Sequence, residues 1–167
     1  MAAEQSSFNR LLQATAVLSG SYLSGSMMTI SLIAFPAIID TTTTPSHLLR
    51  QWVSMFHYGH RAHPTMAAAT LSLYLYAAWR QRTVDKAWTR LLLAGLVTVL
   101  MTPFTWFIIL STNKRILRHA NETQDAAGIG IDDARLLVRK WSWLHLARSV
   151  FPLLGAIIGL TQMFAGQ

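Results

Sequence analysis

Three histidines recur at every third residue, at His57, His60 and His63. On a helix, side chains three residues apart lie about one turn above another, so these imidazoles are expected on one stripe. An imidazole with its ordinary pKa of about 6.5 accepts a proton in its neutral form, which makes His57 and His60 candidate general bases. Imidazole nitrogens also bind iron or copper, and the alternative is a metal held by His57, His60 and His145. No Asp or Glu lies between residues 41 and 84 to complete a facial carboxylate triad locally.

A second stripe combines an aromatic ring, an imidazole and a permanent cation. Trp141, His145 and Arg148 occupy positions i, i+4 and i+7 of an expected helix, and His145 is a further candidate base. Arg148 could donate hydrogen bonds, together with Asn113, to an oxyanion that develops on a substrate. The alternative is that Arg148 extends to lipid headgroups and that Asn113 caps the end of its helix.

Further aromatic and polar side chains lie near the same boundary in the sequence. One interpretation is an interfacial belt, in which tryptophan and tyrosine rings lie at the level of the headgroups. The functional alternative is a wall for a flat aromatic ligand, which a few polar groups would orient. The candidate substrate-binding residues are then Trp141, Trp106, Phe35, Tyr58, Arg61 and His63.

Helices that cross a membrane must position these residues. The chain has 167 residues, of which 52% are hydrophobic and only 13% are charged. A crossing helix needs about 20 mostly apolar residues. Four stretches have this character, at about residues 11–39, 62–80, 90–113 and 141–165. We expect an all-α fold and a single membrane domain over residues 1–167. This domain would be an integral membrane four-helix bundle, with short amphipathic helices at one end, from Pro45 to His63 and from Ile131 to Leu146.

The loop between the second and third stretches sets the expected orientation. It holds Arg80, Arg82, Lys86 and Arg90 against one acid, Asp85, and this excess of basic residues places it in the cytosol. Both termini are then cytosolic, and the endoplasmic reticulum is the default membrane for a eukaryotic protein of this type. In either orientation, the two stripes share one side of the membrane.

Composition excludes several classes of protein. The chain has no cysteine, which excludes disulfides, thiolate catalysis, iron–sulfur clusters and cysteine-bound zinc. Its net charge of +7 comes from bases in loops beside apolar stretches, where anionic headgroups attract them. We therefore expect a lipid bilayer, and no nucleic acid, as the partner. A noncatalytic membrane scaffold or small-solute transport component is the alternative to an enzyme.

The order and spacing of these residues resemble a known family, the small membrane-bound anthrone oxygenases of fungal aromatic polyketide pathways. The resemblance covers nearly the whole chain. It rests on four pieces, which are Ser31-Leu-Ile-Ala-Phe-Pro36, Tyr58-Gly-His-Arg-Ala-His-Pro64, Pro103-Phe-Thr-Trp106 through Asn113, and Trp141-x3-His145-x2-Arg148.

This resemblance implies that the chain oxidises an anthrone, such as emodin anthrone, to its anthraquinone with molecular oxygen. A base, with His145 or His60 as the best candidate, would remove a C10 proton, and Arg148 and Asn113 would stabilise the oxygen anion at C9. Because an ionised anthrone reacts with oxygen by itself, we expect no cofactor and no metal; iron or copper remains the alternative. The partners are a small aromatic polyketide and O2, and the pattern allows a homo-oligomer.

Overall fold

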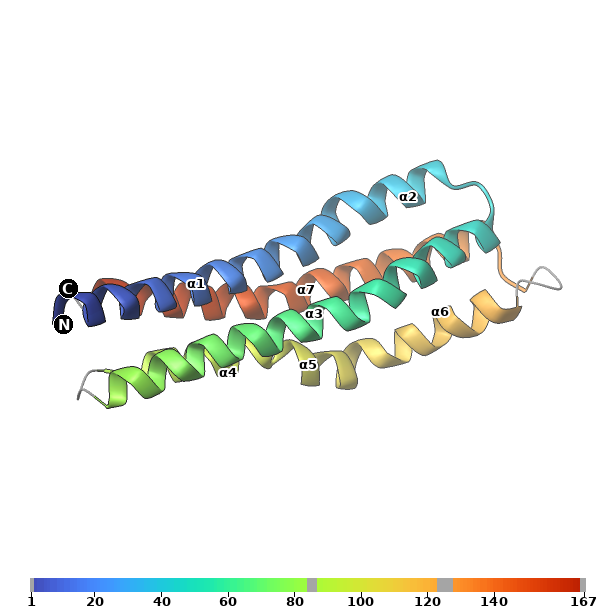
Figure 1. Cartoon of the computed structure of the whole chain (residues 1–167). Helices are drawn as coiled ribbons and strands as arrows, with labels where there is room; N and C mark the ends of the chain where they lie inside the picture. Colours follow the sequence, from blue (N-terminus) through green and yellow to red (C-terminus); the bar gives the residue numbers. More distant parts are fainter. Residues whose placement is uncertain (1, 84–86, 123–127, 166–167) are drawn as a thin grey trace. The chain divides into compact units, whose positions relative to one another are not determined.

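The computed structural model describes residues 2–83, 87–122 and 128–165, which form four continuous helical segments (Figure 1). The first contains α1 (Ala2–Thr29), η1 (Ile30–Ala34) and α2 (Phe35–Thr41). The second is α3 (Pro45–Arg82), and the fourth is α7 (Ile131–Ala165). The third contains α4 (Thr89–Val99), α5 (Met101–Phe104), η2 (Thr105–Ile109) and α6 (Leu110–Glu122). No strand occurs among these described residues, so the all-α expectation is confirmed.

Three of these segments are long and apolar enough to cross a membrane. They are Glu4–Thr41, Thr89–Glu122 and Ile131–Ala165, with mean hydropathies of 1.6, 2.0 and 1.5. Within the described part of the chain, α3 does not reach this apolar character. Its expected span at 62–80 is rich in alanine and carries His63, Tyr74 and Tyr76, which lower its hydropathy. A crossing by α3 therefore stays a prediction.

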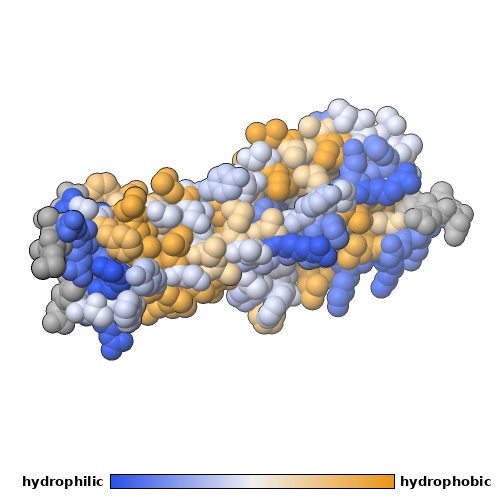
Figure 2. Space-filling view, in the orientation of Figure 1, coloured by the Kyte–Doolittle hydropathy of each residue, from blue (hydrophilic) through white to orange (hydrophobic). Residues whose placement is uncertain are grey.

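Large apolar side chains lie on the outer surface of the helices. Phe107 is 84% exposed and Leu18 69% exposed, and hydrophobic residues cover much of the face seen in Figure 2. In water such a surface would be costly, whereas lipid tails accept it. Together with the three apolar segments, this surface identifies a membrane protein.

The chain forms two compact units. The first comprises residues 1–25, 64–101 and 149–167, and the second comprises residues 26–63 and 102–148. The amphipathic segments expected from Pro45 and from Ile131 are the first turns of α3 and α7, with which they are continuous.

In the first unit, two glycines of α7 allow close packing against α3 and α4. A Cβ at Gly159 would lie 2.6 Å from the Tyr74 hydroxyl of α3, and that hydroxyl donates a hydrogen bond of 3.3 Å to the Gly155 carbonyl. A Cβ at Gly155 would lie 2.7 Å from the Ala94 carbonyl of α4. Both distances are below van der Waals contact, so these positions admit no side chain without movement.

We expect Gly155→Ala to lower the unfolding temperature of the detergent-solubilised protein, because overpacking a well-packed contact costs about 1–3 kcal/mol. Gly25→Ala is the matched control, since nothing lies within 4 Å of a Cβ at Gly25. There, alanine should stabilise the helix by up to about 1 kcal/mol. Equal unfolding temperatures in the two variants would mean that α7 is not packed closely at Gly155.

The second unit is built around Trp141. The Phe35 ring of α2 meets Trp141 edge-on at 5.1 Å, and the Trp52 ring of α3 does so at 5.5 Å. Aromatic pairs prefer such edge-to-face contacts. The buried residues of this core come from α2, α3, η2, α6 and α7, and include Phe35, Ile39, Leu48, Leu49, Trp52, Ile109, Ile116, Val138 and Trp141. This core holds the polar face of α7 in place.

Two π-helical turns interrupt the membrane segments of this unit, each close to a proline. In η1 the Phe35 N–H donates to the Ile30 carbonyl, and in η2 the Leu110 N–H donates to the Thr105 carbonyl. Pro36 follows η1 and Pro103 precedes η2. Proline lacks an N–H, so it disturbs the regular hydrogen-bond ladder. Such π turns are frequent at functional sites because they redirect side chains.

Candidate active site

His145 belongs to the second unit and is buried, with 1% of its surface exposed. Its Nδ1 lies 2.9 Å from the hydroxyl of Ser31, which belongs to the π turn η1. Its ring stacks on Trp141 with centroids 4.6 Å apart, and the His63 ring of α3 lies 5.7 Å away. The imidazole is therefore held by a hydrogen bond and by ring contacts, which suits a group that must keep one orientation.

A second hydrogen bond fastens α7 to η1. The Ser142 hydroxyl donates to the Ser31 carbonyl at 3.0 Å, so Ser31 contacts α7 through both its side chain and its backbone. Neither serine was predicted as a site residue. Their signals in the sequence are weak. Ser31 begins the piece Ser31-Leu-Ile-Ala-Phe-Pro36 of the family resemblance, and Ser142 lies three residues before His145.

Arg148 is partly buried and lies near His63 and His145. Its Nη1 donates a hydrogen bond of 2.9 Å to the Thr105 hydroxyl, which lies at the start of the π turn η2. Its charge acts on both His63 and His145. The Nε of Arg148 and the Nδ1 of His63 are buried and have no hydrogen-bond partner among the residues that the structure describes. A buried unpaired polar atom costs about 1–3 kcal/mol, a cost typical of functional sites.

Asn113 contacts Trp141, the ring on which His145 stacks. The indole Nε1 donates to the Asn113 Oδ1 at 2.7 Å, and both side chains are buried. The acceptor oxygen of Asn113 thus fixes the ring on which His145 stacks. The Nδ2 group of the Asn113 amide would therefore have to donate any hydrogen bond to a substrate oxyanion.

Several predicted site residues lie on the outside. His57, His60 and Arg61 are exposed, and so are Tyr58 at 73% and Trp106 at 66%. The His60 Nδ1 is engaged with the Phe56 carbonyl at 2.9 Å. Because three residues fall short of one turn of about 3.6, the histidine stripe drifts by about 60° at each step. That drift turns His63 into the interior while His57 faces outward.

Four of the six histidines form two separate pairs. His57 and His60 have ring centroids 5.7 Å apart, as do His63 and His145. Among the described residues, no group of three or more His, Asp or Glu side chains is placed to hold a metal ion. The expectation that the reaction needs no metal, and the alternative of iron or copper held by His57, His60 and His145, both stay predictions.

The predicted aromatic wall divides into two parts. Phe35 and Trp141 are buried in the core of the second unit, where Phe35 packs on Trp141 and Trp141 stacks on His145. Tyr58 and Trp106 are exposed, as in an interfacial belt. The stripe of Trp141, His145 and Arg148 thus lies on the inner side of α7, with partners from η1, η2 and α6.

Comparison with known proteins gives consistent matches over most of the chain. A family model described as anthrone oxygenase matches residues 52–158. The chain is 49% identical to Anthrone oxygenase AgnL2 of Paecilomyces divaricatus, over 88% of this chain and 92% of the relative. It is 37% identical to an anthrone oxygenase of Emericella nidulans, with 89% and 95% covered. It is 40% identical to a noranthrone monooxygenase of Aspergillus flavus, with 87% and 70% covered. No solved structure matches the chain.

Proposed function

The chain belongs to the anthrone oxygenase family, and on that premise we propose that His145 is the base with which it begins the oxidation of an anthrone. The protein is an O2-dependent oxidoreductase of aromatic polyketide biosynthesis. In the reaction, the C10 methylene of an anthrone becomes a carbonyl. One oxygen atom enters the product and the other leaves as water.

The first step is removal of a C10 proton by the neutral imidazole of His145. The electron pair of the C–H bond stays with the ring system and places negative charge on the C9 oxygen. The observation that carries this assignment is the fixed, buried imidazole, held by Ser31 at 2.9 Å and stacked on Trp141. A base held in one orientation loses little freedom when it reacts.

Arg148 stabilises the anion through its charge. A permanent cation in a water-poor site interacts with a developing anion far more strongly than it would in water. The hydrogen bond from Arg148 to Thr105 holds this charge beside His145. Asn113 is a positioning residue, because it holds the indole of Trp141.

The anthrolate then supplies the electrons for oxygen. It passes one electron to O2, and the resulting radicals combine to form a C10–O bond. The peroxide takes the proton back from the imidazolium. The O–O bond then breaks, and the second C10 hydrogen leaves with the departing oxygen as water. Since the substrate is the reductant, this sequence uses no cofactor and no metal.

The test is oxygen uptake by detergent-purified protein with emodin anthrone, corrected for spontaneous oxidation of the substrate. We expect one O2 consumed for each anthraquinone formed, at a rate proportional to the protein concentration. Uptake no faster than the background with emodin anthrone and with related anthrones would contradict the proposed function.

We propose that the protein lies in the endoplasmic reticulum with both termini in the cytosol, because the basic loop at residues 80–90 favours that side. The segment between α6 and α7 would then be lumenal. The glycosylation acceptor pattern Asn121-Glu-Thr begins in the last turn of α6, next to this segment, and its last residue lies outside the described residues. We expect a glycosidase to shift the protein on a gel, and Asn121→Gln to abolish that shift. A cytosolic protease that cuts this segment in intact microsomes would contradict the orientation.

A further inference from the structure

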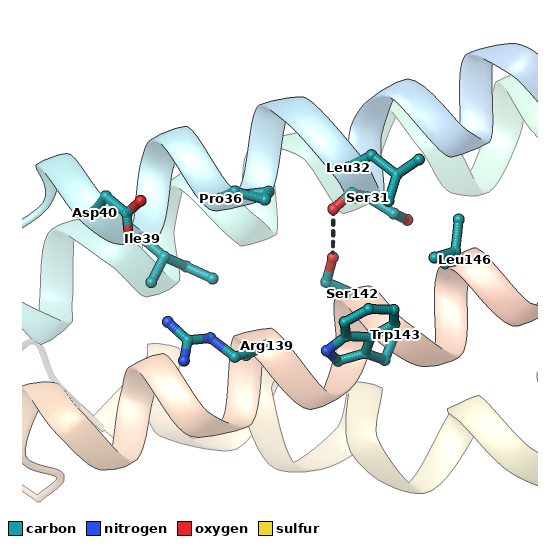
Figure 3. Close-up of a pocket in the computed structure, with 9 residues that line it drawn as sticks. All are labelled: Ser31, Leu32, Pro36, Ile39, Asp40, Arg139, Ser142, Trp143 and Leu146. Atoms are coloured by element: carbon teal, nitrogen blue, oxygen red, sulfur yellow. Dashed lines mark hydrogen bonds between the residues drawn. The ribbon is translucent and has the colours of Figure 1, made fainter.

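A cavity of about 280 Å³ lies within the second unit, between α7 and the segment formed by η1 and α2 (Figure 3). Small-molecule sites usually measure about 300–1,000 Å³, and this cavity lies just below that range, which limits it to one compact ligand. On α7, its lining residues Arg139, Trp143 and Leu146 lie on the side of the helix away from Trp141 and Arg148. The cavity therefore lies on a different face of α7 from Trp141 and Arg148.

The floor of the cavity is the hydrogen-bonded pair Ser31 and Ser142. On its inner side, the Ser31 hydroxyl lies 2.9 Å from the Nδ1 of His145. His145 itself is not among the residues that line the cavity. Ser31 is therefore the side chain that connects a ligand in the cavity with the buried imidazole.

The walls suit a flat and largely apolar molecule. The indole of Trp143, which is 65% exposed, offers a face for ring stacking, and Pro36 with neighbouring aliphatic side chains covers the opposite side. Asp40 on α2 and Arg139 on α7 lie together at one end of the cavity in Figure 3. Asp40 can accept a hydrogen bond from a phenol, and Arg139 can donate to a phenolic or ketone oxygen.

The position of these two charges also indicates how a ligand would enter. Exposed charges avoid the hydrocarbon layer, so Asp40 and Arg139 mark the headgroup level, and the apolar end of the cavity lies deeper. A hydroxylated polycyclic ketone partitions into the same zone, with its oxygens near the headgroups. It would therefore reach the cavity from the bilayer rather than from water.

We propose that this cavity is the docking site of the hydroxylated anthrone and that the Ser31 hydroxyl relays the C10 proton to His145. The inference rests on the proposed function. The C10–H bond breaks as an O–H bond forms at Ser31, while the original Ser31 O–H bond breaks and an N–H bond forms at Nδ1 of His145. The electron pair stays on the anthrolate, and the peroxide later regains the proton by the same route. Arg148 acts on the bound anion through its charge, from the other side of α7.

The first arm of the test measures binding alone, with emodin, the unreactive anthraquinone of emodin anthrone, as the probe. Leu146→Trp should fill the cavity and abolish both emodin binding and turnover. Leu154→Trp is the matched control, an exposed leucine of the same helix outside the lining, and it should retain both. Wild-type binding and turnover in Leu146→Trp would overturn the docking site.

The second arm tests the relay. Ser31→Ala should keep emodin binding and lower kcat by about 100-fold or more, as expected for loss of a proton-transfer group. Ser31→Thr, which retains a hydroxyl, should recover part of that loss. Full kcat in Ser31→Ala would overturn the relay. If the wild-type protein binds emodin and Leu146→Trp does not, but the wild-type protein oxidises no anthrone, the docking site is supported and the proposed reaction is contradicted.

Discussion

We expect His145→Ala to lower kcat for emodin anthrone by about 10²–10⁴-fold, the range over which general bases contribute. The reason is that C10 then has no base connected to it, since the imidazole bonded to Ser31 is gone. The measurement is oxygen uptake at saturating substrate. Membrane insertion and the unfolding temperature of the variant should be determined alongside, because His145 is buried and packed on Trp141.

His60→Ala is the matched histidine control. His60 was an equal candidate for the base in the sequence, yet it is exposed and its Nδ1 is engaged with the Phe56 carbonyl. We expect its kcat to stay within a few-fold of the wild-type value. An active His145→Ala together with an inactive His60→Ala would transfer the base to α3 and contradict the mechanism.

Arg148→Met should lower kcat by about 10-fold, because a charge that acts across the roughly 10 Å width of α7 contributes about 1–2 kcal/mol at an effective dielectric constant of about 20. Methionine keeps much of the length and the apolar stem of arginine but has no charge. Arg148→Lys keeps the charge and should therefore retain most of the activity. The KM should change less than kcat, because the charge acts mainly on the anion formed during the reaction.

A variant of Thr105, the hydrogen-bond partner of Arg148, separates the effect of the charge from the effect of the hydrogen bond. Thr105→Val removes the hydroxyl that accepts from Arg148 Nη1 but leaves the cation in place. If the charge is what matters, this variant should lose much less activity than Arg148→Met. Equal losses in the two variants, or a fully active Arg148→Met, would show that Arg148 has only a structural role.

The parts of the site that the sequence predicts are local ones. Trp141, His145 and Arg148 share a face because their spacing follows the helical repeat, and the structure places them in one continuous helix, α7. The same reasoning was less useful for His57, His60 and His63, because a spacing of three drifts around the helix.

The parts that could not be predicted depend on distant contacts. Ser31 and His145 are 114 residues apart, and although Ser31 begins one of the pieces that carry the family resemblance, no local pattern indicates that its hydroxyl meets His145. The π turns that carry Ser31 and Thr105 also change the helical register, so the faces of these segments cannot be read from a regular repeat. Prolines beside both turns are the only local indication.

In the proposed mechanism histidine acts as a base toward an anthrone and not as a metal ligand. The most direct test is oxygen uptake with emodin anthrone by detergent-purified protein, before and after strong chelation, with metal analysis of the same sample. We predict that metal-free protein consumes oxygen at the untreated rate. Uptake that is lost on chelation and restored by one metal would contradict the account.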